Sequence, residues 1–373
     1  DFRRSRGLGD VYKRQRLTAH LMTQLPSFSE RLLSWFDEYG RTSLPWQQYK
    51  TAYRVWVSEI MLQQTRVSTV IPYYTRFMSV YPSVTDLAEA PLDDVLSLWT
   101  GLGYYARARN MHRAAQIVVS DFEGEFPSSV EALETLPGIG RSTAGAIVTL
   151  GHGGWAPILD GNVKRVLARF HAIEGWPGKA DVLAALWAAS ESHTPRTRTG
   201  DYTQGIMDLG ATLCTKSNPG CFYCPMSDDC QARIENRPAD FPGKKPRKAI
   251  PVRSTVFLQC IDREGHVLLE RRPPTGIWGG LWSFPEIGEK AEVADWLSDN
   301  GLTATGDATE QSRHSHTFSH FKLDITPVVC PIATASFRRS DRDERRWFTM
   351  DEALALGLPA PVLKMLNTLT VKD

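Results

Sequence analysis

Apolar residues recur at helical spacing along the first two thirds of the chain. In "FSERLLSWFDEYG" (28–40) they lie three and four residues apart and stop at Gly40, which predicts a helix that ends there. "TAYRVWVSEIMLQQTRV" (51–67) predicts a second, longer helix, and "PLDDVLSLWTGLG" predicts a third that starts after Pro91 and ends at Gly101. No convincing run of alternating polar and apolar residues breaks this region, so it is predicted to be all-α.

The pattern changes towards the C-terminus. Residues 236–251, "NRPADFPGKKPRKAIP", hold four prolines and five Lys or Arg, which indicates an exposed linker. "STVFLQCI", "DREG" and "HVLLERR" then predict a strand, a turn and a strand, and "HFKLDITPVVC" predicts another strand. "MDEALALGLPAPVLKMLNTL" returns to helix. We therefore predict an all-α domain over 22–235 and a smaller α+β domain over 252–373.

The composition excludes some classes of protein but does not indicate a function. The 373 residues are 42% hydrophobic and 23% charged, which is typical of a globular protein large enough for two domains. No apolar run approaches the roughly 20 residues that cross a bilayer, and the first twenty residues lack the apolar segment of a secretion signal. The net charge of +1 leaves a nucleic-acid partner open.

The first residues follow no period. Residues 1–21 precede Met22, which is a natural start, and we expect them to be a disordered or non-native tail. The alternative is an Arg-rich targeting or DNA-contacting arm.

A glycine pair interrupts the helical pattern. "SSVEALETL" has the capping-box spacing of Ser128 and Glu131, and "LPGIGRSTAGAIV" follows it with Gly138 and Gly140. A dinucleotide-binding loop follows a strand and needs a third glycine, whereas position 143 is Thr. The prediction is helix, tight turn, helix, either as an ordinary connection or as an anion site where backbone N–H groups meet a phosphate.

Two carboxylates have environments that could separate their protonation states. Glu59 has mostly apolar neighbours one helical turn away, Val55, Trp56 and Leu62, so its pKa is expected to be raised. Asp160, in "APILDGNVKRVLARF", lies at a predicted helix start, where it can cap the helix and stay ionised. Such a pair suits glycosidic chemistry, with one proton donor and one anion. The alternatives are an exposed helical glutamate and a plain helix cap.

Four of the six cysteines lie in "CTKSNPGCFYCPMSDDC", with the spacing C-x6-C-x2-C-x5-C. They are Cys214, Cys221, Cys224 and Cys230. The residue types allow a nucleophile, disulfides, a four-thiolate zinc site or an iron–sulfur cluster. Disulfides fit poorly, because six cysteines in so long a chain do not resemble a secreted disulfide scaffold.

Taken in order, these motifs resemble the helix-hairpin-helix, iron–sulfur DNA glycosylases. The stretches that match are "SEIMLQQTRV", "GLGYYARARN", "LPGIGRSTAGAI", "ILDGNVKRVLAR" and the cysteine loop. "RRPPTGIWGGLWSFP" and "HTFSHFKLDI" extend the resemblance through the second domain to the MutY-type adenine DNA glycosylases. The resemblance implies a [4Fe–4S] cluster on the four cysteines and a monomer acting on double-stranded DNA, in a bacterial-type cytoplasm at the nucleoid.

The resemblance also implies roles for single residues. Glu59 matches the acid that protonates adenine, Asp160 the aspartate that stabilises the sugar cation, and Asn162 a polar residue beside them. Gln64 and Tyr104 match residues that wedge into the duplex. The glycine turn, Gly138 and Gly140, matches the hairpin that grips the DNA backbone.

One position separates branches of this superfamily. Bifunctional members carry a lysine that forms a Schiff base, where this chain has Ser142. The resemblance therefore implies a monofunctional enzyme that leaves an abasic site.

The second domain resembles the Nudix fold without its metal-binding helix. Gly280 and Glu286 keep the first spacing of the Nudix signature, but "IGEKAEVADWL" supplies no R-E-x2-E-E. "TFSH" matches a loop that reads 8-oxoguanine, so Ser319 is expected to contact the oxidised base, with Phe318 and His320 shaping the loop.

The function implied is excision of adenine mispaired with 8-oxoguanine or guanine. The alternatives are an enzyme that removes oxidised pyrimidines, a Nudix hydrolase of free nucleotides, and a non-catalytic, redox-responsive DNA-binding module.

Overall fold

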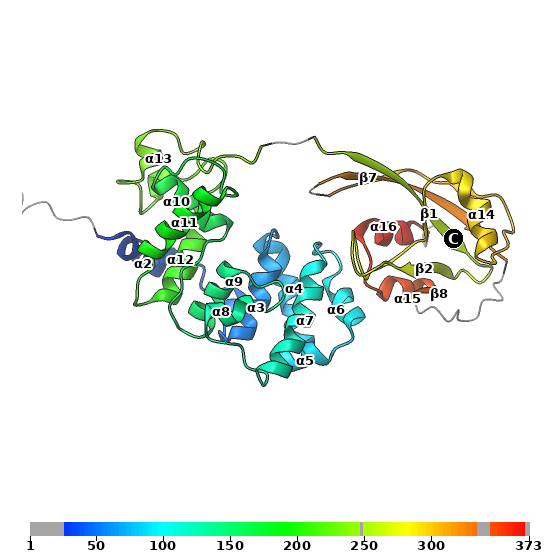
Figure 1. The fold of residues 1–373 in the computed structure, drawn as a ribbon, viewed down its shortest axis with the longest axis horizontal. Coiled ribbons are helices and arrows are strands. Elements are labelled where there is room, and N and C mark those ends of the chain that lie inside the picture. The colour runs from blue at the N-terminus through cyan, green and yellow to red at the C-terminus, as the bar shows by residue number, and fades with distance from the viewer. Residues whose placement is uncertain (1–25, 247–248, 319, 334–343, 370–373) are drawn as a thin grey trace, which may run out of the picture. The chain divides into compact units, whose positions relative to one another are not determined.

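A computed structural model describes residues 26–246, 249–318, 320–333 and 344–369 (Figure 1). Up to residue 246, the described residues form helices and turns and no strand, as the sequence predicts. The tail 1–21 lies outside the described residues. No helix in the described part of the chain is long and apolar enough to cross a membrane.

The chain divides into two compact units, each made of two segments. One contains Asp1–Arg41 and Trp155–Lys244, and the other contains Thr42–Gly154 and Lys245–Asp373. The helical region predicted as one domain therefore contributes to both units.

The first unit is built around the contact of α10 with α11, α12 and α13, and of α12 with α2. Its elements are α2 (Phe28–Tyr39), α10 (Gly161–Phe170), α11 (Ala180–His193), α12 (Thr199–Thr212), the 3-10 turn η3 (Cys221–Tyr223) and α13 (Gln231–Ile234). Helix α2 ends at Gly40, as predicted, and begins with a reciprocal cap between Ser27 and Glu30. The rings of Phe28 and Phe170 pack edge to face at 4.9 Å.

The helical part of the second unit packs around large buried aromatic residues, which include Trp56, Tyr74 and Trp99. Its elements are η1 (Pro45–Gln47), α3 (Ala52–Leu62), α4 (Val67–Val80), α5 (Val84–Glu89), α6 (Leu92–Trp99), α7 (Ala106–Asp121), α8 (Val130–Glu134), α9 (Arg141–Ala146) and the π-helical turn η2 (Ile147–Gly151).

Two local predictions in this unit are wrong. The long helix predicted over 51–67 is two helices, because Gln64 has a left-handed backbone (φ 57°) that an α-helix cannot contain. The cap of α8 is Ser129, whose side chain accepts from the N–H of Ala132, rather than Ser128. Both differences move helix ends and leave the predicted helix, turn, helix arrangement of α8 and α9 unchanged.

The second unit also contains a mixed sheet with the strand order β3-β2-β1-β7-β5. Strands β1 and β7 run parallel over their whole length, and the other pairings are antiparallel. The strands are β1 (Val252–Ile261), β2 (Val267–Arg271), β3 (Trp282–Ser283), β4 (Glu286–Ile287), β5 (Thr309–Glu310), β6 (His314–Thr317), β7 (Lys322–Pro331) and β8 (Arg345–Phe348). The other elements are η4 (Lys290–Glu292), α14 (Val293–Asp299), α15 (Met350–Ala355) and α16 (Ala360–Leu369).

This sheet confirms the predicted α+β character of the C-terminal region. Helix α14 covers a core that includes Leu258, Cys260 and Val328, with Val293 and Leu297 contributed by the helix. The predicted strand, turn and strand over 254–272 is the β1–β2 hairpin.

Candidate active site and cysteine cluster

Glu59 lies in the last turn of α3, in the second unit. Its carboxylate-bearing side chain is half-buried, and its neighbours Val55 and Trp56 are buried. The apolar surroundings expected from the sequence are therefore present. A carboxyl group in such surroundings is suited to donate a proton.

Gln64 and Tyr104 are exposed residues with left-handed backbone conformations. Gln64 is exposed in the turn after α3, and Tyr104 is 52% exposed in the turn before α7. Both have positive φ, 57° at Gln64 and 50° at Tyr104, which residues other than glycine rarely adopt. The structure thus presents both predicted wedge residues at the surface on tightly held turns.

The glycine hairpin connects α8 and α9. Gly138 has φ 82°, and a Cβ at this position would lie 3.0 Å from Cβ of Asn110, so glycine is needed for conformation and for space. Gly140 is the N-cap of α9 and makes no side-chain cap. Ser142 lies in the first turn of α9, half-buried. Open N–H groups at a helix start can receive an anion.

Asp160 is the N-cap of α10, in the first unit. Its Oδ1 accepts from the N–H of Val163 at 2.8 Å, and its Oδ2 accepts from Nδ2 of Asn162 at 3.2 Å. Burial raises the pKa of Asp160, and this outweighs the lowering by its hydrogen bonds to Val163 and Asn162. The helix cap expected from the sequence at Asp160 is confirmed.

Asn162 is held from its other side by Arg165. Nη2 of Arg165 donates to Oδ1 of Asn162 at 2.8 Å and to the carbonyl of Gly210 at 2.6 Å. Nε of the same side chain donates to the carbonyl of Cys214 at 2.7 Å. A Cβ at position 210 would lie 2.6 Å from Cβ of Asn162, so a glycine allows this close approach of α12 to α10. Arg165 therefore joins the neighbour of Asp160 to the first residue of the cysteine loop.

The four loop cysteines surround one small cavity. Cys214, Cys221, Cys224 and Cys230 all line it and none is in a disulfide. Arg169, which is only 3% exposed, also lines the cavity, and its Nη1 donates to Sγ of Cys214 at 3.3 Å. Burial raises the pKa of Cys224 to about 12 and raises that of Cys230, and the neighbouring cysteines raise both further. Such crowded thiols suit a bound cation, which would favour their thiolate forms.

The spacing of the sulfur atoms bears on which metal group fits. Among the described residues, three potential ligand atoms come within 4.8 Å of one another only at Asp262, Glu264 and His266. No three of the four loop sulfurs are therefore that close, although all four cysteines line the same cavity. The set is more open than a site for a single ion.

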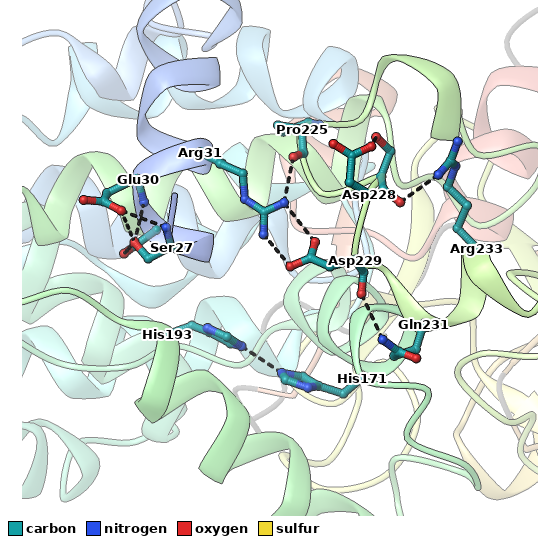
Figure 2. Close-up of polar contacts among 12 residues, drawn as sticks. Ser27, Glu30, Arg31, His171, His193, Pro225, Asp228, Asp229, Gln231 and Arg233 are labelled. Carbon is teal, nitrogen blue, oxygen red and sulfur yellow. Dashed lines mark hydrogen bonds and ion pairs between the residues drawn. The ribbon is translucent and has the colours of Figure 1, made fainter. Parts of the chain in front are cut away.

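Two contacts beside this loop were not predicted from the sequence (Figure 2). Arg31 of α2 donates to both carboxylate oxygens of Asp229, at 2.8 and 2.7 Å, and ties the cysteine loop to the N-terminal helix. His171 and His193 stack with their Nε2 atoms 2.8 Å apart. Burial lowers the pKa of both, that of His193 to about 4, so the pair is neutral at pH 7. No local sequence signal marks these partners, which are 22 or more residues apart.

In the second domain, Glu286 is engaged in structural contacts. It accepts from Nη1 of Arg272 at 2.6 Å and from Oγ1 of Thr255 at 2.8 Å. Phe318 packs against Trp278 with ring centroids 5.2 Å apart, and the exposed His320 packs on Phe321 at 4.7 Å. Ser319 lies outside the described residues. The loop around it is thus flanked by an aromatic cluster.

Comparison with known proteins assigns both parts of the chain. Residues 57–191 match the model of the HhH-GPD superfamily of base excision DNA repair proteins, and residues 256–368 match the NUDIX domain. The chain is 40% identical over 340 residues to an adenine DNA glycosylase of Buchnera aphidicola subsp. Acyrthosiphon pisum (strain APS), covering 91% of this chain and 97% of that protein. It is 35% identical to a Homo sapiens adenine DNA glycosylase, with 89% and 72% covered. A solved thermostable thymine-DNA glycosylase matches 56% of this chain and 95% of its own, with a TM-score of 0.51 and 27% identity.

Proposed function

Because the chain belongs to the adenine DNA glycosylases of base excision repair, we propose that it removes adenine paired with 8-oxoguanine from duplex DNA and leaves an abasic site. The observation that carries this proposal is the combination of parts on one chain. A glycosylase domain carries Glu59 and Asp160, and a NUDIX domain follows it that lacks the metal-binding glutamates of a hydrolase.

The two carboxylates have complementary roles in this reaction. Glu59 donates its proton to N7 of the flipped adenine, so that the electron pair of the C1′–N9 bond leaves with a neutral base. Asp160, as the anion, stabilises the sugar cation until water adds to C1′ and gives up a proton. Asn162 orients the Asp160 carboxylate through its 3.2 Å hydrogen bond.

DNA is held through the hairpin and the exposed wedge residues. The N–H groups that follow Gly138 and Gly140 suit a phosphate, which binds without regard to sequence. Gln64 and Tyr104 enter the stack in place of the extruded adenine, and the ring of Tyr104 replaces lost base stacking.

The NUDIX domain reads the base opposite the adenine. Adenine is an undamaged base, so its own structure cannot mark it for removal. Glu286, which keeps the first spacing of the Nudix signature, is paired with Arg272 and Thr255, and the sequence after it supplies no R-E-x2-E-E, which supports a domain that binds but does not hydrolyse. Ser319 is the proposed contact to 8-oxoguanine, on a loop flanked by Phe318 and His320.

Ser142 makes the enzyme monofunctional. Its hydroxyl stands where bifunctional relatives of the superfamily carry an amine, and a hydroxyl cannot form a Schiff base with the sugar. The enzyme is therefore expected to leave the DNA strand uncut at the abasic site.

The cysteine loop holds a [4Fe–4S] cluster through Cys214, Cys221, Cys224 and Cys230. A single zinc ion with bonds of ~2.3 Å would place its four sulfurs about 3.8 Å apart. The wider set of sulfurs around one cavity supports the larger group. With all four cysteines as ligands, the loop would be held at four points and no thiolate would remain free as a nucleophile.

A single-turnover assay on an adenine:8-oxoguanine duplex tests the proposal. The unsubstituted chain should release adenine, while Glu59→Gln and Asp160→Asn should lose at least about 100-fold in rate and still bind the duplex. Glu38→Gln, on the exposed surface of α2, is the matched control and should keep the parent rate.

Two further substrates separate the alternatives. A thymine-glycol duplex tests the removal of oxidised pyrimidines, and free nucleoside triphosphates test a Nudix hydrolase. Release of thymine glycol in preference to adenine, or near-parent rates in either carboxylate variant, would contradict the proposal.

A further inference from the structure

Arg107 holds the two turns that carry Gln64 and Tyr104. It lies in the first turn of α7 and its guanidinium is half-buried. Five main-chain carbonyls and one hydroxyl accept hydrogen bonds from its two terminal nitrogens. The acceptors of Nη1 are Ile60 O (2.8 Å), Met61 O (3.0 Å) and Gln63 O (2.6 Å), and those of Nη2 are Thr65 Oγ1 (3.3 Å), Leu102 O (3.2 Å) and Gly103 O (3.1 Å).

These acceptors belong to two segments that are distant in sequence. The first group is the C-terminal end of α3, whose last carbonyls have no partner within the helix. The second group is the turn immediately before Tyr104. One side chain therefore joins the end of the helix that carries Glu59 to the turn before α7.

The position of Arg107 is unfavourable for its own helix. A cation in the first turn of α7 opposes the helix dipole, and burial lowers the pKa of Arg107 to about 10, which still leaves it charged at pH 7. The guanidinium lies over the rings of Trp99 and Tyr104, 5.3 and 5.5 Å from their centroids. What offsets these costs is the set of six hydrogen bonds, which all serve the two turns.

Both turns also contain backbone that must be held. Gln64 and Tyr104 have φ of 57° and 50°, and each side chain is exposed. Residues other than glycine keep such a conformation only where the surroundings enforce it. Arg107 donates to the residue immediately before each of them, Gln63 and Gly103.

We propose that Arg107 is a positioning residue for Gln64 and Tyr104, the two residues that enter the DNA base stack. It fixes the two turns that carry them relative to each other, so that both side chains can enter the stack together. This inference rests on the proposed function. If the two turns were mobile, ordering them would cost conformational entropy each time Gln64 and Tyr104 entered the duplex. Turns that Arg107 already holds avoid this cost. The planar fork of arginine reaches several carbonyls at once, and lysine, with one nitrogen, cannot reproduce this.

Two other hydrogen bonds also contact the segment before Tyr104, so the domain is expected to stay folded when Arg107 is changed. Nε1 of Trp99 donates to the carbonyl of Gly103 at 3.1 Å, and the hydroxyl of Tyr73 donates to the carbonyl of Thr100 at 2.9 Å. Arg107→Lys should therefore loosen the wedge rather than unfold the domain. Tyr73→Phe removes the hydrogen bond to Thr100 and should loosen the same turn, but less than Arg107→Lys does.

A double-mutant cycle distinguishes a wedge brace from a general contribution to stability. Arg107→Lys should slow single-turnover excision about 10- to 100-fold, because a misplaced positioning group costs about that much. In a Gln64→Ala, Tyr104→Ala background, the same change should cost less than about threefold, since the side chains it positions are gone. Tyr73→Phe should slow excision less, and its effect should also vanish in that background. Arg113→Lys, exposed on α7, is the matched control and should keep the parent rate.

Hydrogen exchange on the DNA-free protein gives a readout that does not need the substrate. In Arg107→Lys, peptides over 62–66 and 100–104 should exchange at least about fivefold faster, with other helices unchanged. Parent-like exchange at these turns, or a rate loss that is equal in the parent and the wedge-deleted background, would overturn the inference. If the unsubstituted chain does not release adenine, the proposed function fails, while the exchange result still decides whether Arg107 braces the turns.

Discussion

Arg165 donates a 2.8 Å hydrogen bond to the side-chain oxygen of Asn162. Because Asn162 donates in turn to Asp160, and Arg165 also donates to the carbonyl of Cys214, the proposed sugar-stabilising carboxylate is two hydrogen bonds from the side chain that contacts the cysteine loop. These contacts are consistent with the proposal that the loop supports the site and takes no part in its chemistry.

Arg165→Met should lower the single-turnover rate about tenfold by releasing Asn162, the order of loss expected when a positioning hydrogen bond is removed. Substrate binding should change little, because the wedge and hairpin lie in the other unit. Lys164→Met, on the same helix, is the control. A parent-like rate in Arg165→Met would show that Asn162 needs no such support.

The raised pKa of Asp160 predicts the acidic side of the pH profile. Excision requires the anion, so the single-turnover rate should rise with pH through the folded-state pKa of Asp160, which burial places above 3.8. The single-turnover rate is measured from pH 4 upward at saturating enzyme. A rate that stays constant down to pH 4 would contradict the assignment.

The same pKa has a consequence for stability. The folded state binds this proton more tightly than the unfolded chain, so the contribution of Asp160 to the free energy of unfolding is greatest below pH 3.8 and falls as pH rises through its folded pKa. Asp160→Asn, which can still cap α10, should therefore be at least as stable as the parent at pH 7.

Ser142→Lys should introduce covalent chemistry on the sugar. An amine at this position can attack C1′ and form a Schiff base that borohydride reduces to a stable enzyme–DNA adduct. The unsubstituted chain should give little adduct under the same conditions. Ser128→Lys adds a lysine at an exposed position just before α8 and should behave like the parent. Abundant trapping by the parent would contradict the monofunctional proposal.

The features that were predictable from the sequence are those encoded locally. Gly40 ends α2, Gly138 makes the hairpin turn, and Asp160 caps α10, because each depends on a few neighbouring residues. The β1–β2 hairpin was predictable for the same reason, because its two strands are adjacent in the sequence.

The break between α3 and α4 was not predictable in this way. "LQQTRV" contains no glycine or proline, and the left-handed Gln64 lies beside carbonyls that a side chain more than forty residues away, Arg107, holds. The arginines of α10 illustrate the same limit. Arg165 and Arg169 resemble a solvated helical face in sequence, yet each donates to main-chain carbonyls within residues 210–241. Only the tertiary fold reveals such partners.

Removing the buried ion pair between Arg41 and Asp208 should strongly destabilise the first unit. Asp208 is fully buried, and Oδ1 accepts from Nη2 of Arg41 at 2.6 Å and from Gln204 at 2.8 Å. Arg41→Met should reduce the free energy of unfolding by about 3–5 kcal/mol, because it leaves a buried charge without its cation. Arg198→Met, which breaks an exposed pair with Asp37, should cost no more than about 1 kcal/mol. Urea denaturation measures both, and equal losses would contradict the argument.

Arg169 offers a test of the cysteine loop that does not depend on removing a ligand. Its Nε donates to the carbonyls of Pro238 and Phe241, and its Nη1 donates to the carbonyl of Thr215 at 2.7 Å as well as to Sγ of Cys214. It therefore anchors the start of the loop and provides a positive hydrogen-bond donor at one sulfur, which favours the thiolate that a metal needs.

Protein produced with ample iron should be brown, with broad visible absorption that Cys224→Ser abolishes. Arg169→Gln should still acquire the colour but lose it about 10- to 100-fold faster under a chelator, the range typical when a partner of a metal ligand is removed. Arg237→Gln is the control, since Arg237 is exposed and pairs with Glu235 and Asp240. Equal bleaching rates in the two variants would show that the bond to Cys214 does not stabilise the bound group, and a colourless, zinc-containing protein would contradict the cluster itself.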